Sequence, residues 1–267
     1  MSKAEKIPFG KKMIAEKNGA VGWMIFNNPQ RHNALSLDMW EAVPKILDLF
    51  EKDPKIRVVV LKGAGDKAFI SGADISEFAK LRSSAEAVEN YDHVSHEASA
   101  RLSKASKPTI AMINGAAVGS GMDMSLHCDI RIGCEKTRFI GYQQAGQIME
   151  NGGSYYLPKM VGLGRALEFA YTGSLNAERA YEWGLLNHLV ASEDLEKTTR
   201  ELCDRIIALP PLVQWTSKRI MRAAMDSTLE TTMVLTSNAG GILQSSADAK
   251  EARQAFVEKR KPEFKGV

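Results

Sequence analysis

The stretch INGAAVGSGMD, residues 113–123, decides the fold. Its first residues end the apolar run of an expected buried strand, and Gly119, Ser120 and Gly121 form a corner after which a helix is expected. The N-terminus of a helix leaves backbone N–H groups without partners and carries a partial positive charge. The corner therefore predicts a place where backbone donors face an oxygen that carries negative charge.

A second glycine-marked stretch, AFISGAD, covers residues 68–74 and also follows an expected strand. Gly72 lets the chain turn so that successive N–H groups point at one anion. Open α/β sheets bind ligands where their strands end, although either stretch taken alone is more typical of an ordinary tight turn. Neither stretch has the G-x-G-x-x-G pattern or a phosphate loop with Gly-Lys-Ser/Thr, which disfavours a dinucleotide or a nucleoside triphosphate.

The rest of the chain predicts an α/β fold with a helical end. Buried strands are expected at residues 21–26, 57–61, 108–113, 129–132 and 185–190, with helices between them and a largely parallel sheet. Ser36 is expected to cap a helix that reaches about Lys52, with Pro44 kinking it or marking its start. A short loop at 82–84 and one exposed helix are expected within 80–107, where they would cover a binding site. The apolar periodicity of 193–258 is helical, which divides the chain into a core, 1–192, and a helical region, 193–267.

Composition narrows the classes of function. The net charge of +3 comes from 35 basic and 32 acidic residues without a block of like charges, so no nucleic-acid partner is expected. Neither a membrane span nor a secretory signal is indicated, and a cytoplasmic location is expected. Cys128, Cys134 and Cys203 lack close spacing and are expected as buried thiols. No metal site is predicted, because His93 and His96 have no third ligand.

Four motifs in a fixed order resemble the crotonase (enoyl-CoA hydratase/isomerase) family over nearly the whole chain. They are NPQRHNAL at 28–35, SGADI at 71–75, NGAAVGSG at 114–121 followed by CDI at 128–130, and AFVEKRKP at 255–262. The resemblance implies a crotonase fold: a core of repeated ββα units and a helical C-terminal region that forms a homotrimer or a homohexamer. It also implies an acyl-CoA thioester substrate and no separate cofactor, since coenzyme A is part of that substrate.

The resemblance also assigns site residues. The thioester oxygen would receive the N–H groups of Ala73 and Ser120, where Ser120 replaces the family's usual glycine but keeps the backbone donor. The other substrate-binding positions would be Arg31, His32, Ala34, Gly72, Asp74, Ile75, Ser76, Gly119 and Gln143.

The acidic residues bear on the reaction. Asp123 stands at the first of two positions where hydratases of the family carry glutamate, and the second falls at Tyr142 or Gln143. Glu150 matches the acid of the family's G-x-x-P-[DE]-x-G-G pattern, with Met149 in place of proline. Burial beside Ile148, Met149, Tyr155 and Tyr156 is expected to raise the pKa of Glu150.

Four functions are compatible with these residues. The first is an enoyl-CoA isomerase in which Glu150 moves a proton between two carbons while Asp123 assists or orients. The second is an enoyl-CoA hydratase in which both acids activate water. A thioester hydrolase that uses Glu150 is the third, and a non-catalytic acyl-CoA binding protein is the fourth.

Overall fold

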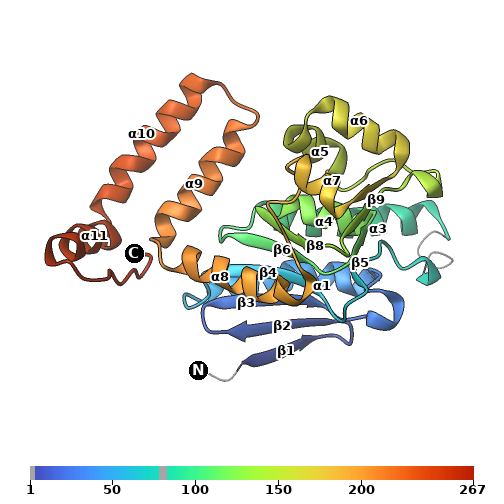
Figure 1. Cartoon of the computed structure of the whole chain (residues 1–267), viewed down its shortest axis with the longest axis horizontal. Helices are drawn as coiled ribbons and strands as arrows, with labels where there is room; N and C mark the ends of the chain where they lie inside the picture. Colours follow the sequence, from blue (N-terminus) through green and yellow to red (C-terminus); the bar gives the residue numbers. More distant parts are fainter. Residues whose placement is uncertain (1–3, 78–82) are drawn as a thin grey trace.

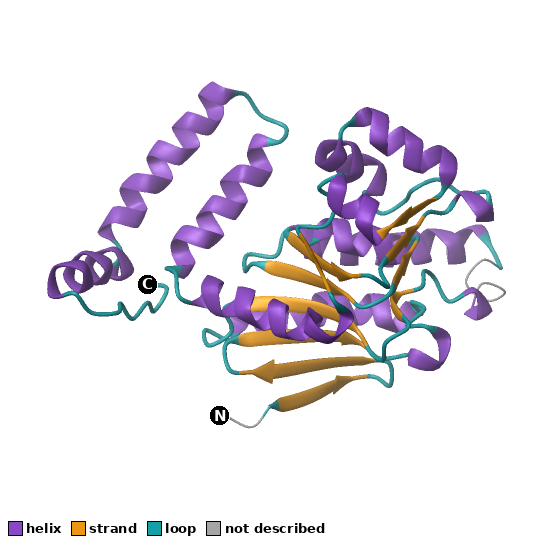
Figure 2. Cartoon of the chain, viewed as in Figure 1, coloured by secondary structure: helices purple, strands orange, loops and turns teal. Residues whose placement is uncertain are grey.

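The computed structural model describes residues 4–77 and 83–267, and two sheets form its centre (Figures 1 and 2). The larger sheet has the spatial order β1 (Glu5–Phe9), β2 (Met13–Asn18), β3 (Val21–Phe26), β4 (Val58–Gly63), β6 (Thr109–Ile113), β8 (Ile130–Cys134) and β11 (His188–Val190). The smaller sheet has the order β10 (Ser174–Asn176), β9 (Arg138–Ile140), β7 (Ala116–Val118) and β5 (Ala68–Ile70). From β3 to β11 the larger sheet is parallel, as expected, while β1 to β3 are antiparallel.

Successive strands alternate between the two sheets. The chain passes from β4 to β5, from β6 to β7 and from β8 to β9, each time leaving the larger sheet for the smaller one. Helices follow each pair: α3 (Ala85–Ser103), then α4 (Ser120–His127), then α5 (Gly153–Val161), α6 (Leu163–Thr172) and, after β10, α7 (Ala177–Glu182). This repetition confirms the expected ββα units.

Both faces of the larger sheet are covered, which explains its unbroken apolar strands. Alternate residues of β3 point to opposite faces, so Met24 and Phe26 join the core beneath α1 (Leu37–Lys52), whereas Trp23 joins a second core beneath α8 (Leu195–Ile207). A continuous run such as VGWMIF is therefore stable at the centre of the molecule.

Helix α1 departs from expectation at two residues. It continues through Pro44, although a proline inside a helix costs about 3 kcal/mol. Its buried face includes Trp40, Ile46 and Phe50, and each such side chain stabilises by about 1.5–3 kcal/mol, which outweighs that cost. Ser36 occupies the cap position, but its hydroxyl bonds to Asp38 and the carboxylate of Glu77 accepts the N–H of Leu37 instead.

Helix α3 is not the exposed helix that was expected. One face packs against α1, where Trp40 Nε1–H donates to the hydroxyl of Tyr91 over 3.2 Å and Ala98 and Leu102 are fully buried. Alanines and serines on this face allow the two helices to approach closely. Residues 80–82, part of the expected loop and cover, lie outside the described residues.

The C-terminal region is helical, as expected. It consists of α8, α9 (Pro211–Ala224), α10 (Leu229–Ser245) and α11 (Ala247–Glu258), and α9 and α10 form a hairpin that projects from the sheets (Figure 1). Short 3-10 turns complete the described chain at Pro29–Arg31 (η1), Ile75–Glu77 (η2), Gln143–Ala145 (η3) and Ser192–Asp194 (η4). Within the described residues, no helix is long and apolar enough to cross a membrane.

Candidate active site

The two glycine-marked stretches lie side by side at one edge of the smaller sheet. Because β5 and β7 are parallel neighbours, the chain leaves both at the same edge. Contact is close there: a Cβ added to Gly121 would lie 2.2 Å from the carbonyl oxygen of Ile70. Only glycine permits this approach of the start of α4 to the end of β5.

Ala73 presents its N–H away from the neighbouring segment. Leu35 donates its N–H to the carbonyl of Gly72 over 2.8 Å and accepts the N–H of Asp74 over 2.7 Å. In this parallel bridge both bonds of Leu35 go to the residues on either side of Ala73. Across residues 4–77 and 83–267, no acceptor takes the N–H of Ala73.

Ser120 is the first residue of α4, so its N–H has no partner within the helix. Gly119 precedes it at φ 50°, and the ring of Tyr142 lies 2.9 Å from the place a Cβ on Gly119 would occupy. The described part of the chain supplies no acceptor for the Ser120 N–H. All eight residues of α4 are buried, so this end of the helix is shielded from water.

Asp123, one turn further along α4, is a deeply buried carboxyl group. Burial raises its pKa to about 8, and the negative charge of Glu150 acts in the same direction. The hydroxyl of Tyr142 donates to Oδ2 over 2.8 Å and partly offsets this rise; it also lies 3.2 Å from Ser120 Oγ. Oδ1 is buried without a partner among the described residues. Asp123 therefore holds a proton near neutral pH.

Glu150 lies in the loop between η3 and α5 and is half-buried. The apolar enclosure expected around it is incomplete, because the side chain of Ile148 is 79% exposed and that of Tyr155 is 40% exposed. Of the two candidate acids, the one that the fold buries is Asp123. Ile148 lies in the loop before α5 with its side chain in solvent, which its apolar character does not reveal.

The residues expected to bind the coenzyme form one connected surface. Arg31 pairs with Asp74 over 3.2 Å, and the N–H and hydroxyl of Ser76 donate to the same carboxylate oxygen over 3.1 and 2.6 Å. Burial acts to raise the pKa of Asp74, but the bonds from Ser76 and the charge of Arg31 outweigh it and lower that pKa. The Asp74 carboxylate is therefore engaged by an ion pair and hydrogen bonds, whereas the neighbouring Ile75 is 75% exposed.

Other expected contacts lie on the adjoining turns. His32 adopts a left-handed conformation at φ 52°, and the Ala34 N–H donates to the Arg31 carbonyl over 3.0 Å, which folds this segment into a tight turn. The Ser71 hydroxyl donates to the same carbonyl over 3.2 Å and links the turn to the Gly72 loop. Gln143 lines an apolar cavity of about 250 Å³ together with Met149, Leu157, Ala166 and Leu167.

Two residues near the site were not assigned a role from the sequence. Tyr142 was considered only as one of two residues at the second glutamate position of hydratases, where it cannot replace a carboxylate base, whereas the structure shows it donating to Asp123. His127 carried no signal by itself, yet it lies on α4 with Ser120 and Asp123 at positions i, i+3 and i+7. That spacing places all three on one helix face and was available in the sequence.

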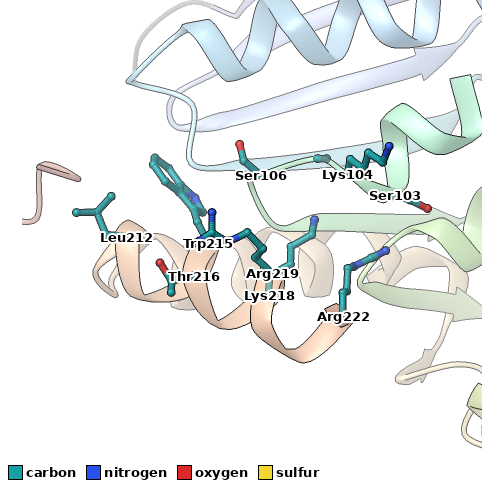
Figure 3. A pocket seen from close by; sticks show the side chains of 10 residues that line it. Ser103, Lys104, Ser106, Leu212, Trp215, Thr216, Lys218, Arg219 and Arg222 are labelled. Atoms are coloured by element: carbon teal, nitrogen blue, oxygen red, sulfur yellow. The ribbon is translucent and has the colours of Figure 1, made fainter. Parts of the chain in front are cut away.

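A larger cavity, of about 470 Å³, is separate from this site. It lies between α9 and the segment before β6, where Lys104, Arg219 and the indole of Trp215 line it (Figure 3). Within residues 4–77 and 83–267 no group of three or more His, Cys, Asp or Glu side chains is placed to hold a metal ion. Cys128, Cys134 and Cys203 are buried free thiols, as expected.

Alternating ββα units with a helical C-terminal region define a protein of the crotonase fold. Residues 16–267 match the family model described as enoyl-CoA hydratase/isomerase. The chain belongs to this family, within the crotonase superfamily, and is an enzyme.

Named relatives of this chain differ in their reactions. It is 33% identical over 256 residues to the short-chain-enoyl-CoA hydratase of Clostridium acetobutylicum, covering 94% of this chain and 96% of that protein. It is 30% identical to the 1,2-epoxyphenylacetyl-CoA isomerase of Escherichia coli K12, with 91% and 94% covered. The crystal structure of an enoyl-CoA hydratase from Bacillus anthracis superposes with a TM-score of 0.92 at 31% identity, covering 96% of this chain and all of that one.

Proposed function

We propose that this enzyme is an enoyl-CoA isomerase that holds an acyl-CoA thioester and moves a double bond along its acyl chain. The observation that carries the proposal is the unequal burial of its two acids. Asp123 is buried and keeps a proton near neutral pH, whereas Glu150 is half-buried and acts on it as a negative charge. A buried acid that keeps its proton and a more exposed acid are suited to different roles in one reaction.

The thioester oxygen would bind to the N–H groups of Ala73 and Ser120. Both donors lack partners within the described residues, and the loops that carry them lie side by side. The N-terminus of α4 adds a partial positive charge in a buried setting, where one such donor contributes about 2.7–4 kcal/mol to the stabilisation of a forming enolate. The surface formed by Arg31, Asp74 and Ser76 would hold the coenzyme, and the 250 Å³ cavity would receive the acyl chain.

The reaction then needs one base. In a 3-enoyl thioester the Glu150 carboxylate takes a proton from C2, and the electron pair delocalises through the double bond onto the thioester oxygen as a dienolate. The same proton returns to C4, which yields the 2-enoyl thioester. Between the two steps Glu150 carries the transferred proton and the negative charge lies on the dienolate oxygen. Protonated Asp123, whose Oδ2 accepts the hydroxyl hydrogen of Tyr142, would stabilise Glu150 only while it is a carboxylate, before the first step and after the second.

A hydratase is the second candidate, favoured by the electrostatic interaction between Asp123 and Glu150. In this reaction Glu150 removes a proton from water as its oxygen adds to C3 of a 2-enoyl thioester, and Asp123 delivers its proton to C2. The hydratase from Clostridium acetobutylicum, at 33% identity, supports this candidate by its name.

The two candidates are separated by supplying 2-enoyl- and 3-enoyl-CoA thioesters and following double-bond shift, water addition and free thiol. A double-bond shift without hydration supports the isomerase. Hydration identifies the second candidate, free thiol identifies a hydrolase, and binding without turnover identifies a non-catalytic binding protein.

Two substitutions test the roles of the acids. Glu150→Gln keeps the shape of the side chain but removes the base, so turnover is expected to fall by at least about 100-fold with little change in binding. Asp123→Asn should cost less in an isomerase and as much or more in a hydratase. Full activity of Glu150→Gln together with an inactive Asp123→Asn enzyme would refute the isomerase assignment.

A further inference from the structure

Four residues from separate elements meet beneath the loop that carries Glu150. They are Ser103 at the end of α3, His127 at the end of α4, Asn151 in the loop and Tyr156 in α5. The ring of His127 is buried, with Nε2 2.6 Å from the carbonyl oxygen of Asn151 and Nδ1 hydrogen-bonded to Ser103 Oγ. Ser103 Oγ in turn lies 2.9 Å from the hydroxyl of Tyr156.

The carbonyl oxygen of Asn151 fixes the direction of every hydrogen bond in this cluster. A carbonyl oxygen only accepts, so Nε2 of His127 must carry a hydrogen. Burial and, to a smaller extent, the charge of Arg222 lower the pKa of His127 to about 4 against the opposing effect of its bond to Asn151, so the ring is neutral and Nδ1 accepts from Ser103. Ser103 has a single hydrogen, which leaves the hydroxyl of Tyr156 to donate to Ser103. One tautomer of His127 satisfies all four groups.

The surroundings of Ser103 agree with this direction. Ser103 stands at the rim of the 470 Å³ cavity, and in Figure 3 its hydroxyl points away from Trp215. The hydroxyl is therefore directed towards its hydrogen bond with His127 rather than into the cavity. The ring of Tyr156 adds an edge contact with His127 at 5.0 Å between ring centres, which restricts the imidazole further.

The segment that His127 contacts has a left-handed backbone. Asn151 is buried with φ at 45°, a conformation that few residues other than glycine adopt and that asparagine tolerates best among them. Gly152 follows at φ 87°, and a Cβ added there would lie 3.1 Å from Cε1 of His127. The ring thus supports the turn by a hydrogen bond at Asn151 and by direct packing at Gly152.

Glu150 immediately precedes this turn, and its carbonyl accepts the N–H of Gly153 over 2.9 Å. We propose that His127 is a positioning residue, which Ser103 holds in the Nε2–H tautomer so that its bond to Asn151 places the carboxylate of Glu150 over the substrate. This inference rests on the proposed function only in taking Glu150 as the base. Small displacements of a reacting group cost up to about 100-fold in rate, so the bond bears on kcat rather than on binding.

Three variants and one control test the proposal. In His127→Leu the donor is lost, and kcat should fall by about 10- to 100-fold with KM changed less than about twofold. In His127→Gln the amide N–H can occupy the place of Nε2–H, so most of the rate should return. Ser103→Ala removes the group that fixes the tautomer and should give an intermediate loss. Ser95→Ala replaces a buried serine of the same helix, whose hydroxyl donates to the Asp92 carbonyl of α3, and should leave kcat unchanged.

The Glu150→Gln background separates positioning from a general loss of structure. If His127 acts through Glu150, His127→Leu should cause no further loss in an enzyme that already lacks the base. A loss of equal size in both backgrounds, or an unchanged kcat in His127→Leu, would overturn the proposal.

A spectroscopic measurement tests the cluster without reference to activity. The chain has five histidines, and the ¹⁵N imidazole spectrum of the enzyme at neutral pH, assigned by comparison with His127→Gln, should show His127 neutral and protonated at Nε2. A ring protonated at Nδ1 would refute the cluster. Full turnover of Glu150→Gln with an Nε2–H ring would instead refute the proposed function and leave His127 as an anchor of the turn alone.

Discussion

Tyr142 donates its hydroxyl hydrogen to Oδ2 of Asp123 over 2.8 Å, although 19 residues separate the two along the chain. Asp123 lies on α4 and Tyr142 just before η3, so the bond joins the helix to the loop that leads towards Glu150. Oδ1 has no partner in the part of the chain that the structure describes. Tyr142 is therefore the residue that orients this carboxyl group.

Tyr142→Phe should raise the pKa of Asp123 above about 8, because donation from Tyr142 lowers it. The free energy of unfolding should fall by about 1–3 kcal/mol, the cost of leaving a buried acceptor unsatisfied. A ¹³C titration of the aspartate carboxyl groups and urea unfolding measure the two effects. Tyr171→Phe, which removes a hydroxyl from a side chain that is 79% exposed, should change neither quantity.

Asp123 should make the protein less stable as the pH rises. Its pKa lies at about 8 in the folded chain against 3.8 for an aspartate in the unfolded chain, so the folded state binds more protons between these limits. Its contribution to stability is complete below about pH 4 and is lost as the pH rises through about 8, with a slope of at most about 1.4 kcal/mol per pH unit. Asp123→Asn should remove this slope in urea unfolding followed from pH 4 to 8.

His127 provides the opposite dependence and serves as an internal control. Its pKa is lowered from 6.5 to about 4, so its contribution is complete above pH 6.5 and is lost as the pH falls to about 4. His127→Gln should remove this acid-side loss and leave the slope at higher pH that belongs to Asp123. Equal effects of the two substitutions on both sides would contradict these assignments.

Gly153→Ala should destabilise the protein and disturb the site together. The added Cβ would lie 2.1 Å from Asp123 Oδ1 and 2.7 Å from Met149 Cε, and overpacking of this kind costs about 1–3 kcal/mol. Thermal unfolding and the Asp123 carboxyl resonance report the two consequences. Gly164→Ala in α6 meets no atom within 4 Å and should stabilise its helix by up to about 1 kcal/mol.

We expect the purified enzyme to form a trimer or a pair of stacked trimers. In α10 no residue is buried within one chain, and Met233 and Ile242 are 63% and 73% exposed. An apolar helix face of this size is normally covered by another chain. Light scattering at micromolar concentration should show the oligomer, and Ile242→Glu should weaken it. Tyr171→Glu on α6, away from α10 in Figure 1, should not, and a monomeric native enzyme would refute the expectation.

The sequence predicted an element correctly where its local residue pattern matches the burial of that element in the folded chain. The run VGWMIF is apolar at every position, and β3 is indeed covered on both faces. The glycine corners at 72 and 119–121 were also recognisable, because each combines a strand end with a residue that tolerates an unusual backbone. Pro44 was misleading, since the burial of the α1 face that outweighs its cost depends on the whole core.

The interior of the site was less predictable, because its contacts join distant segments. Asp123 and Glu150 were both recognised as candidate acids, but their order of burial depends on the packing of α4 against α5. The hydrogen bond from His127 to Asn151 joins residues 24 positions apart, and no local sequence pattern predicts it. The residue types indicated which side chains belong to the candidate site, whereas the relative burial of those side chains could be seen only in the folded chain.

Helix α4 carries Ser120, Asp123 and His127 within eight residues. A helix rises about 1.5 Å per residue, so the axial offsets of Asp123 and His127 from Ser120 are about 4.5 and 10.5 Å, and they do not change unless the helix does. Glu150, by contrast, is carried by a loop. In the proposed reaction, acceptance of a longer or bulkier acyl group would therefore come from altered loop residues around Glu150, while the proposed donor Ser120, Asp123 and His127 shift only as one rigid body.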